Sequence, residues 1–158
     1  MMLTMVPSAF AEGADGDTLQ NKINQASENA TITLDKAYTE SITIPEGKTI
    51  TLDLNGQTLI NEEGKHTITN EGTLTIVGTG TVDNVSHGKG AVYNDAGATC
   101  TILGGNYTRS QENGQSDSDS GGNSWYAIKN FGTMTIGEEG APNDAVKVSF
   151  TGKYSSLV

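Results

Sequence analysis

The polar stretch over 110–124 carries the residues that come closest to a metal-binding pattern. Asp117, Asp119 and Asn123 lie at short alternating spacing, and carboxylate and amide oxygens are the ligands that calcium prefers. The pattern departs from a calcium loop because a glycine replaces the third acid and no glutamate follows at the twelfth position. Calcium is therefore a candidate cofactor, and a polar loop without bound metal is the competing interpretation.

An aromatic pair, Trp125 and Tyr126, follows this stretch and offers a different chemistry. Aromatic rings present flat apolar faces on which sugar rings can stack, and loops on a rigid scaffold are common ligand sites. Tyr93, at an outward strand position, and Arg109, directly before the stretch, complete the candidate ligand-binding set. The alternative is that Trp125 covers an exposed corner of the scaffold.

The residues give little support to catalysis. Cys100 is the single cysteine, but the repeat described below places it in a column of apolar residues, away from His66 and His87. Polysaccharide hydrolysis needs paired carboxylates, whereas Asp53 and Asp83 are isolated in the sequence. A polysaccharide lyase or hydrolase stays an alternative, with no catalytic residue assigned.

A phrase that occurs three times, over 67–76, 91–102 and 127–136, organises the chain. It is ten residues long in the first and last copies, and the middle copy is two residues longer at the turn. Each copy is a short strand, a corner containing asparagine and glycine, and a second strand with alternate threonines. The corner residues Asn70 and Asn94 are 24 apart (94 − 70 = 24), and a repeat of this length closes one coil of a solenoid. The sequence therefore predicts an all-β parallel β-helix. Hairpins at the Asn-Gly corners, giving an antiparallel sandwich, are the alternative.

Alignment of the three copies predicts vertical columns of like residues. The inward columns are Ile68–Val92–Ile128, Leu74–Cys100–Met134 and Ile76–Ile102–Ile136. Asn70, Asn94 and Asn130 should form a hydrogen-bonded ladder at one corner. Gly72 and Gly132 should supply the unusual backbone angle that turns this corner. Outward threonines should form two columns, which are typical of exposed strands, with ice binding as a minor alternative.

A short amphipathic helix over 18–27 should precede the strands. Asp17 and Gln20 have the spacing of a capping box, and Leu19, Ile23 and Ala26 recur at helical spacing. A helix this short needs packing to be stable, so we expect it to cover the open end of the solenoid. The capping segment is thus assigned to 17–28 and the β-helix to 29–158.

The first residues indicate export. Residues 1–11 resemble the end of a signal peptide, with Ala9-Phe10-Ala11 as a small-x-small cleavage site, and a polar leader follows over 12–16. We therefore expect the protein to be secreted or displayed at the cell surface.

Charge argues against two classes of partner. The 158-residue chain has a formal net charge of −10, with Asp+Glu 19 against Lys+Arg 9. Such a surface repels nucleic-acid phosphates and anionic lipid. No apolar run approaches the roughly 20 residues that span a bilayer. We expect neither nucleic-acid binding nor membrane insertion.

Three segments, over 31–34, 41–48 and 50–59, resemble the beginning of right-handed β-helix proteins of the pectin-lyase-like superfamily. They resemble in particular the non-enzymatic β-helix modules of bacterial surface proteins. The resemblance implies a right-handed solenoid with a capping helix, and such a fold hosts many activities. We therefore expect a secreted or cell-surface scaffold or adhesin that binds a glycan or host ligand through residues 110–126.

The last predicted strand covers 145–150, and no capping segment is recognisable after it. An uncapped rung exposes apolar surface and an unpaired strand edge. We expect either a longer β-helix or self-association through this open rung. End-to-end assembly into fibres is the corresponding alternative function.

Overall fold

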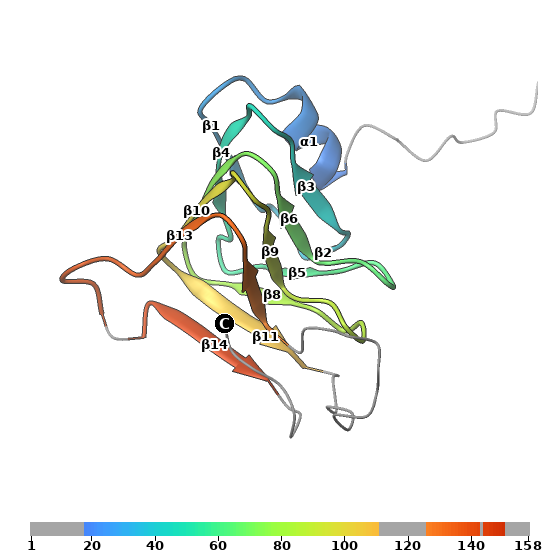
Figure 1. Cartoon of the computed structure of the whole chain (residues 1–158), viewed down its shortest axis with the longest axis vertical. Helices are drawn as coiled ribbons and strands as arrows, with labels where there is room; N and C mark the ends of the chain where they lie inside the picture. Colours follow the sequence, from blue (N-terminus) through green and yellow to red (C-terminus); the bar gives the residue numbers. More distant parts are fainter. Residues whose placement is uncertain (1–17, 111–125, 143, 151–158) are drawn as a thin grey trace, which may run out of the picture.

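A computed structural model describes residues 18–110, 126–142 and 144–150 of the chain (Figure 1). It is an all-β right-handed parallel β-helix with one short helix at its N-terminal end, which confirms the predicted fold class. The elements in chain order are α1 (Leu19–Gln25), β1 (Ala30–Thr33), β2 (Tyr38–Thr39), β3 (Ile42–Ile44), β4 (Thr49–Asp53), β5 (Thr58–Ile60), β6 (Ile68–Asn70), β7 (Thr73–Val77), β8 (Thr81–Asp83), β9 (Val92–Asn94), β10 (Thr99–Ile102), β11 (Gly105–Arg109), β12 (Ile128–Asn130), β13 (Thr133–Ile136) and β14 (Val146–Phe150).

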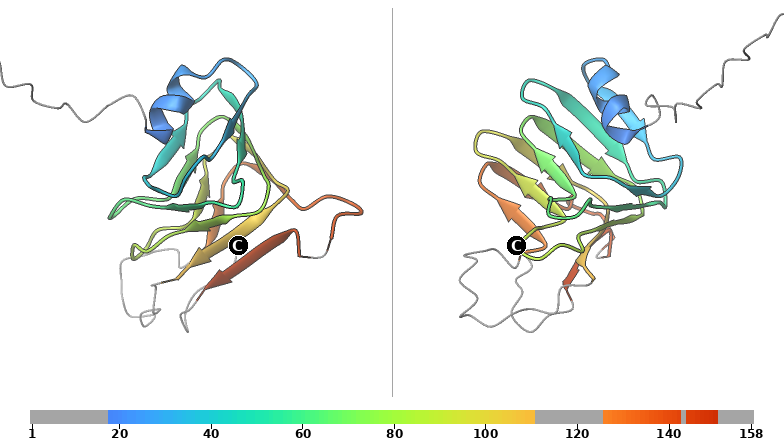
Figure 2. Two further views of the ribbon diagram at one scale, coloured as in Figure 1. Left: turned by 180° about the vertical axis from the view of Figure 1, so that it is seen from behind. Right: turned by 90° about the vertical axis from the view of Figure 1, so that its right-hand side faces the viewer.

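Three parallel sheets form the walls of the solenoid. Sheet A has the order β1-β4-β7-β10-β13, sheet B has the order β14-β11-β8-β5-β2, and sheet C has the order β12-β9-β6-β3. The coils lie one above another along the axis, as the two views of Figure 2 show. Each coil contributes a strand to successive sheets, so a position in one coil lies over the equivalent position in the next.

The predicted inward columns are confirmed by the strand register. Val92 pairs with Ile68 and Ile128, and Cys100 pairs with Leu74 and Met134. The members of these columns in the inner coils are fully buried, namely Ile68, Val92, Leu74, Cys100, Ile76 and Ile102. Ile136, however, is 41% exposed, because β13 is the last strand of sheet A and has no described coil beyond it.

The predicted asparagine ladder is also confirmed. Asn70 Nδ2 donates to Asn94 Oδ1 at 2.7 Å, and Asn94 Nδ2 donates to Asn130 Oδ1 at 2.8 Å. Asn70 and Asn94 are fully buried, and their amides also donate to the main-chain carbonyls of Thr99 and Thr133. The ladder thus satisfies buried polar groups while tying three coils together.

The role predicted for Gly72 and Gly132 is wrong. Neither residue has a positive φ; in the middle coil Gly97 has one, at 86°. A Cβ added to Gly72 would lie 2.6 Å from the carbonyl oxygen of Lys48, and one added to Gly132 would lie 2.5 Å from that of Asp95. Glycine is needed at these corners because the preceding coil comes too close for a side chain.

Helix α1 covers the N-terminal end of the solenoid, as predicted, and buries Leu19 and Ile23 completely (Figure 1). Its N-cap is Thr18, whose hydroxyl accepts from the Asn21 amide at 3.1 Å, rather than the predicted Asp17, which lies outside the described residues. Gln20 does not close a capping box. Its side-chain amide bonds both the N–H and the C=O of Thr43 on β3, at 2.7 and 3.0 Å.

Charged side chains from the first coil hold both ends of α1. Glu40 accepts from the main-chain amides of Leu19 and Gln20, each at 2.8 Å. Lys48 Nζ donates to three carbonyls of the last turn and the cap, those of Ile23, Asn24 and Ala26, at 2.7–2.9 Å. A negative group at the N-terminus and a positive group at the C-terminus suit the helix dipole. Because α1 covers the N-terminal end of the solenoid, end-to-end assembly of copies into fibres would require α1 to move away from that end.

The remaining sequence-based assignments at the ends of the chain fall outside the described residues. These are the signal-like segment 1–11, the leader 12–16 and the residues 151–158. In the part of the chain that is described, no helix has the length and apolar character needed to cross a membrane.

Candidate functional site

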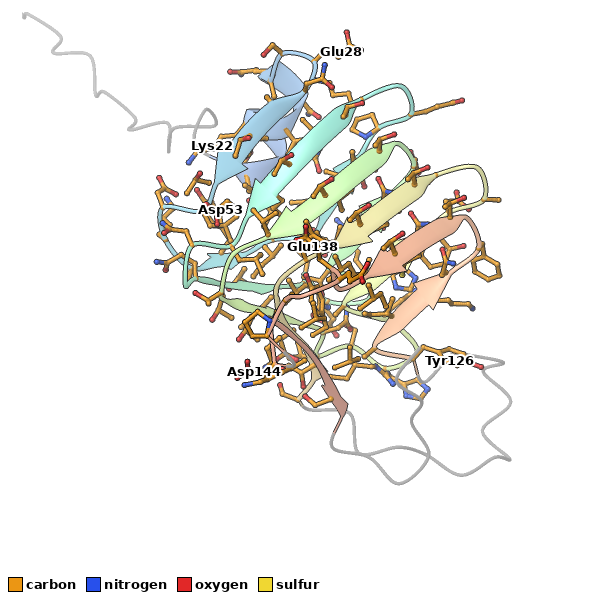
Figure 3. All side chains as sticks on the ribbon, turned by 90° about the vertical axis from the view of Figure 1, so that its left-hand side faces the viewer. Lys22, Glu28, Asp53, Tyr126, Glu138 and Asp144 are labelled. Atoms are coloured by element: carbon orange, nitrogen blue, oxygen red, sulfur yellow. The ribbon has the colours of Figure 1, made fainter. Side chains whose placement is uncertain are left out.

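The predicted site residues divide into three groups in the structure. The candidate calcium ligands Asp117, Asp119 and Asn123, together with Trp125, lie outside the described residues. Tyr93 lies on β9, and Tyr126 lies two residues before β12, the neighbouring strand of sheet C. Figure 3 shows Tyr126 beside the last coil, at the opposite end of the β-helix from Glu28.

Arg109 does not join the two tyrosines on the surface. It is the last residue of β11 in sheet B, where buried and partly buried residues alternate, and its side chain is fully buried on the same side as Tyr107. The guanidinium therefore contributes positive charge from inside the coil and offers no exposed surface to a ligand.

The structure places four aromatic and imidazole rings together along sheet C, which we call the ring face. The ring centroids of His66 and Tyr93 are 4.7 Å apart with an interplanar angle of 28°, and those of Tyr93 and Phe131 are 5.6 Å apart. Phe131 is 55% exposed and Tyr126 is 36% exposed, and both line a hollow of about 220 Å³. The ring face (His66, Tyr93, Tyr126 and Phe131) thus crosses successive coils.

Strand register explains why Tyr93 points outward. On β9 it lies between Val92 and Asn94, which are both fully buried, so the alternation of a strand turns its side chain to the solvent. Its neighbours in the outward column are Thr69 on β6 and Lys129 on β12. The aromatic ring of Tyr93 and the ammonium group of Lys129 therefore lie at equivalent positions of adjacent coils.

Sequence reasoning left two residues of the ring face, His66 and Phe131, out of the predicted site. Phe131 directly follows β12 at the corner. Its amide donates to the Asn94 carbonyl, as the amides of Glu71 and Asp95 donate to the carbonyls of Ile44 and Asn70 one coil earlier in each case. Phe131 thus takes the corner position that acidic residues occupy in the preceding coils. An exposed phenylalanine in a column of acids is the signal that the repeat alignment contained.

His66 is held in its neutral form beside Tyr93. Its Nδ1 accepts from the Gly90 amide at 2.9 Å, so the proton of the neutral ring lies on Nε2. The pKa of His66 is lowered from 6.5 to about 4, first by burial and then by the positive charge of Lys89. The imidazole is therefore uncharged at neutral pH.

Lysines surround the rings. Lys129 Nζ lies 5.0 Å from the ring centroid of Phe131, a cation–π distance. Lys65 pairs with Glu62, three residues earlier. Lys89 lines the groove beside His66 and makes no ion pair within the described ranges. The ring face therefore combines flat apolar surface with positive charge.

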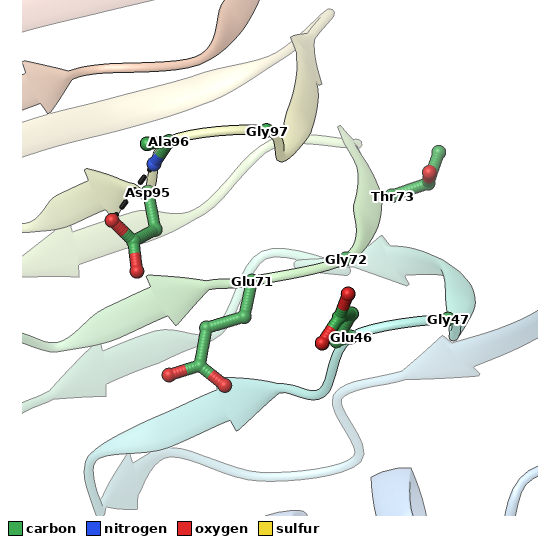
Figure 4. A pocket seen from close by; sticks show the side chains of 8 residues that line it. All are labelled: Glu46, Gly47, Glu71, Gly72, Thr73, Asp95, Ala96 and Gly97. Atoms are coloured by element: carbon green, nitrogen blue, oxygen red, sulfur yellow. Dashed lines mark hydrogen bonds between the residues drawn. The ribbon is translucent and has the colours of Figure 1, made fainter.

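A second hollow, of about 370 Å³, lies at the corner between sheets C and A (Figure 4). It is lined by Glu46, Glu71 and Asp95, and Asp95 Oδ1 accepts from the Ala96 amide at 2.7 Å. Within the part of the chain that the structure covers, no group of three or more His, Cys, Asp or Glu is arranged to hold a metal ion. The acidic corner is therefore a charged surface without the arrangement of a metal site.

The residues considered for catalysis are either buried in the core or bonded to nearby main chain. Cys100 is fully buried, as predicted, and burial raises the pKa of its thiol to about 12. Asp83 accepts from the Ser110 amide at 2.9 Å, and Asp53 accepts from the Asn55 amide at 3.0 Å. Each carboxylate thus stabilises local main chain, and neither is brought beside another carboxylate by these contacts.

The outward threonine columns are present on sheet A. One column is Thr49–Thr73–Thr99–Thr133, and the other is Thr31–Thr51–Thr75–Thr101–Thr135. Their side chains are partly or fully exposed, which suits a hydroxyl-bearing β-branched residue. The columns give this sheet an even surface of hydroxyl and methyl groups.

Comparison of the chain with protein-family models, curated proteins and solved structures found no match.

Proposed function

We propose that the protein is a secreted or cell-surface β-helix scaffold that binds a glycan through the ring face. The observation that carries the proposal is the row of rings formed by His66, Tyr93 and Phe131 across neighbouring coils, which ends in the exposed hollow beside Tyr126. His66 stacks on Tyr93, and Phe131 is tilted against Tyr93 by 53°. Flat ring faces exclude water from the apolar faces of sugars, and the tyrosine hydroxyls can bond sugar hydroxyls. The exposed apolar surface of Phe131 would be covered in the complex.

The scaffold suits this role because it fixes the rings before a ligand arrives. Neighbouring strands of a sheet are about 4.8 Å apart, so rings on successive coils form a row along the axis of the solenoid. The asparagine ladder holds the corner beside Tyr93 and Phe131 in place. A pre-organised row loses little side-chain entropy on binding, and an extended polymer can contact its rings in succession.

Two features of the sequence support export of the protein and a carbohydrate ligand. The signal-like segment 1–11 favours export, and the resemblance to surface modules of the pectin-lyase-like superfamily favours a carbohydrate ligand. The proposal assigns the protein binding rather than turnover, in keeping with the local structural contacts of Asp53 and Asp83.

A glycan array followed by titration tests the proposal. Wild-type protein should bind at least one class of glycan, and Tyr93→Ala should weaken binding about tenfold, the equivalent of about 1.4 kcal/mol. Thr101→Ala, on the outward side of sheet A, is the matched control and should bind as the wild type does. Trp125→Ala reports whether the predicted loop shares the site. Absence of binding, or equal binding by Tyr93→Ala and wild type, would overturn the proposal.

A further inference from the structure

A polar groove adjoins the ring face on sheet C. It has a volume of about 390 Å³ and is lined by Ser41, Thr43, Lys65, His66, Thr69 and Lys89, together with Ile42 and Gly64. His66 belongs to both surfaces, because its imidazole lines the groove and also stacks on Tyr93. The groove and the ring face are therefore contiguous at His66.

The groove is rich in hydrogen-bond donors. Lys65 and Lys89 supply ammonium groups, and Thr43 and Thr69 lie at equivalent outward positions of β3 and β6. His66 accepts at Nδ1 from Gly90, which leaves the Nε2–H as a further donor. No carboxylate lines the groove. Such a set of groups suits a ligand that carries negatively charged oxygens.

The groove is positively charged, whereas the whole protein is negatively charged. The chain has a formal net charge of −10, yet this face carries Lys65, Lys89 and Lys129. Glu62 offsets Lys65, whereas the described residues give Lys89 no ion pair. The lowered pKa of His66, which comes first from burial and then from Lys89, Lys129 and Arg109, reflects the same positive surroundings.

We infer that the groove binds an anionic substituent, a carboxylate or a sulfate, of the glycan whose sugar rings stack on the ring face. The inference rests on the proposed function and narrows its ligand class. Sugar stacking would supply contact area, and Lys89 would supply a charge-assisted hydrogen bond to the substituent. The net negative charge of the protein would repel an anionic glycan from other parts of the surface. Such a glycan would therefore bind only where the lysines of the groove contact its charged substituent.

The test compares polymers that share a backbone and differ in charge. Glucan, galactan and N-acetylglucosamine backbones are used as neutral, carboxymethylated and sulfated forms, with polyglutamate as an acidic polymer without sugar. Affinities are measured by calorimetry at 50 and 150 mM salt for wild type, Tyr93→Ala, Lys89→Gln and Lys147→Gln. Lys147 lies on β14 of sheet B and serves as the control for removal of a surface lysine.

We expect at least one charged form to bind about tenfold more tightly than its neutral form. Lys89→Gln should lose most of that preference, Tyr93→Ala should weaken all forms, and Lys147→Gln should change neither. The carboxymethylated and sulfated arms identify which substituent fits.

Three outcomes would contradict the account in distinguishable ways. Equal binding of neutral and charged forms, unchanged in Lys89→Gln, overturns the anionic inference and leaves glycan binding intact. Binding of polyglutamate as tight as that of the charged glycans overturns the glycan proposal. Absence of binding to every polymer overturns both.

Discussion

The imidazole of His66 lies against the ring of Tyr93, with centroids 4.7 Å apart, although the two residues come from successive coils of the solenoid. The Gly90 amide fixes the imidazole at its edge by donating to Nδ1 at 2.9 Å. Protonation of Nδ1 would remove this acceptor, so the stack depends on a neutral ring. The packing of the ring face therefore depends on pH through the protonation of His66 Nδ1.

The first prediction concerns the pH dependence of folding. The folded pKa of His66 is about 4, below its ordinary value of 6.5, so the unfolded chain binds this proton first as pH falls. The stabilisation from neutral His66 is complete above pH 6.5 and is lost as pH falls toward 4. His66→Gln, which keeps an acceptor, should remove this loss, on the order of 1 kcal/mol after allowance for solvent screening.

Urea titrations of both proteins at pH 7, 5.5 and 4 measure this difference. The carboxylates titrate in both proteins and cancel in the comparison. Parallel pH profiles for wild type and His66→Gln would show that His66 is not held neutral by the fold.

The second prediction concerns the asparagine ladder. Asn94 is fully buried, bonds its neighbours above and below, and donates to the Thr133 carbonyl at 3.1 Å. Asn94→Ala leaves buried groups without partners and should lower the free energy of unfolding by about 2–3 kcal/mol. Asn130→Ala, at the exposed end of the ladder, should cost about 1 kcal/mol or less. Urea titrations measure both losses of unfolding free energy. Equal losses for the two variants would mean that the buried hydrogen bonds of Asn94 add no more stability than the exposed ones of Asn130.

The third prediction concerns the cap. Lys48→Met keeps the aliphatic stem of the side chain but removes the donors to the Ile23, Asn24 and Ala26 carbonyls. The helix end should lose about 1–2 kcal/mol, seen as faster hydrogen exchange of the α1 amides than of the sheet amides. Lys147→Met, whose lysine is exposed and lies 3.7 Å from Asp144, is the control. Unchanged exchange in α1 would contradict the role assigned to Lys48.

The fourth prediction separates two uses of glycine. Gly132→Ala would place a Cβ 2.5 Å from the Asp95 carbonyl oxygen and should cost about 2–4 kcal/mol, because main chain must move. Gly137→Ala meets nothing within 4 Å but has a φ of 83°, so it should cost about 1–2 kcal/mol. Thermal unfolding of the two variants measures the order. The reverse order would show that the close approach of the preceding coil does not require glycine at position 132.

Much of the fold could be predicted because stacked residues repeat in the sequence. Equivalent positions such as Leu74 and Cys100 lie over each other, so aligning the copies is equivalent to reading the register. The same alignment identified the ladder of Asn94. It could not reveal that Gly72 avoids a neighbouring carbonyl, because that depends on the distance between coils. Nor could it show that Gln20 bonds Thr43, since this contact lies outside the repeat.

The candidate site was predicted only in part. Tyr93 was identified from its outward strand position and Tyr126 from its place in the aromatic pair after the polar stretch. Tyr93 lies on β9, and Tyr126 lies two residues before β12, the neighbouring strand of sheet C. Arg109 was included because it precedes the long polar stretch, but strand alternation turns it inward. His66 was set aside because it does not align with Cys100, although its actual partner is Tyr93. Ring stacking between coils depends on side-chain direction at corners, which the repeat alone does not specify.

The most direct test of glycan binding by the ring face is to observe the aromatic side chains of the protein by NMR during titration with the best ligand from the array. The ring resonances of Tyr93 and Phe131 should shift and receive saturation transfer from the sugar protons. Those of Tyr38 and Tyr107, which are buried beneath α1 and inside sheet B, should not change. Ligand binding that leaves Tyr93 and Phe131 unperturbed would contradict the account.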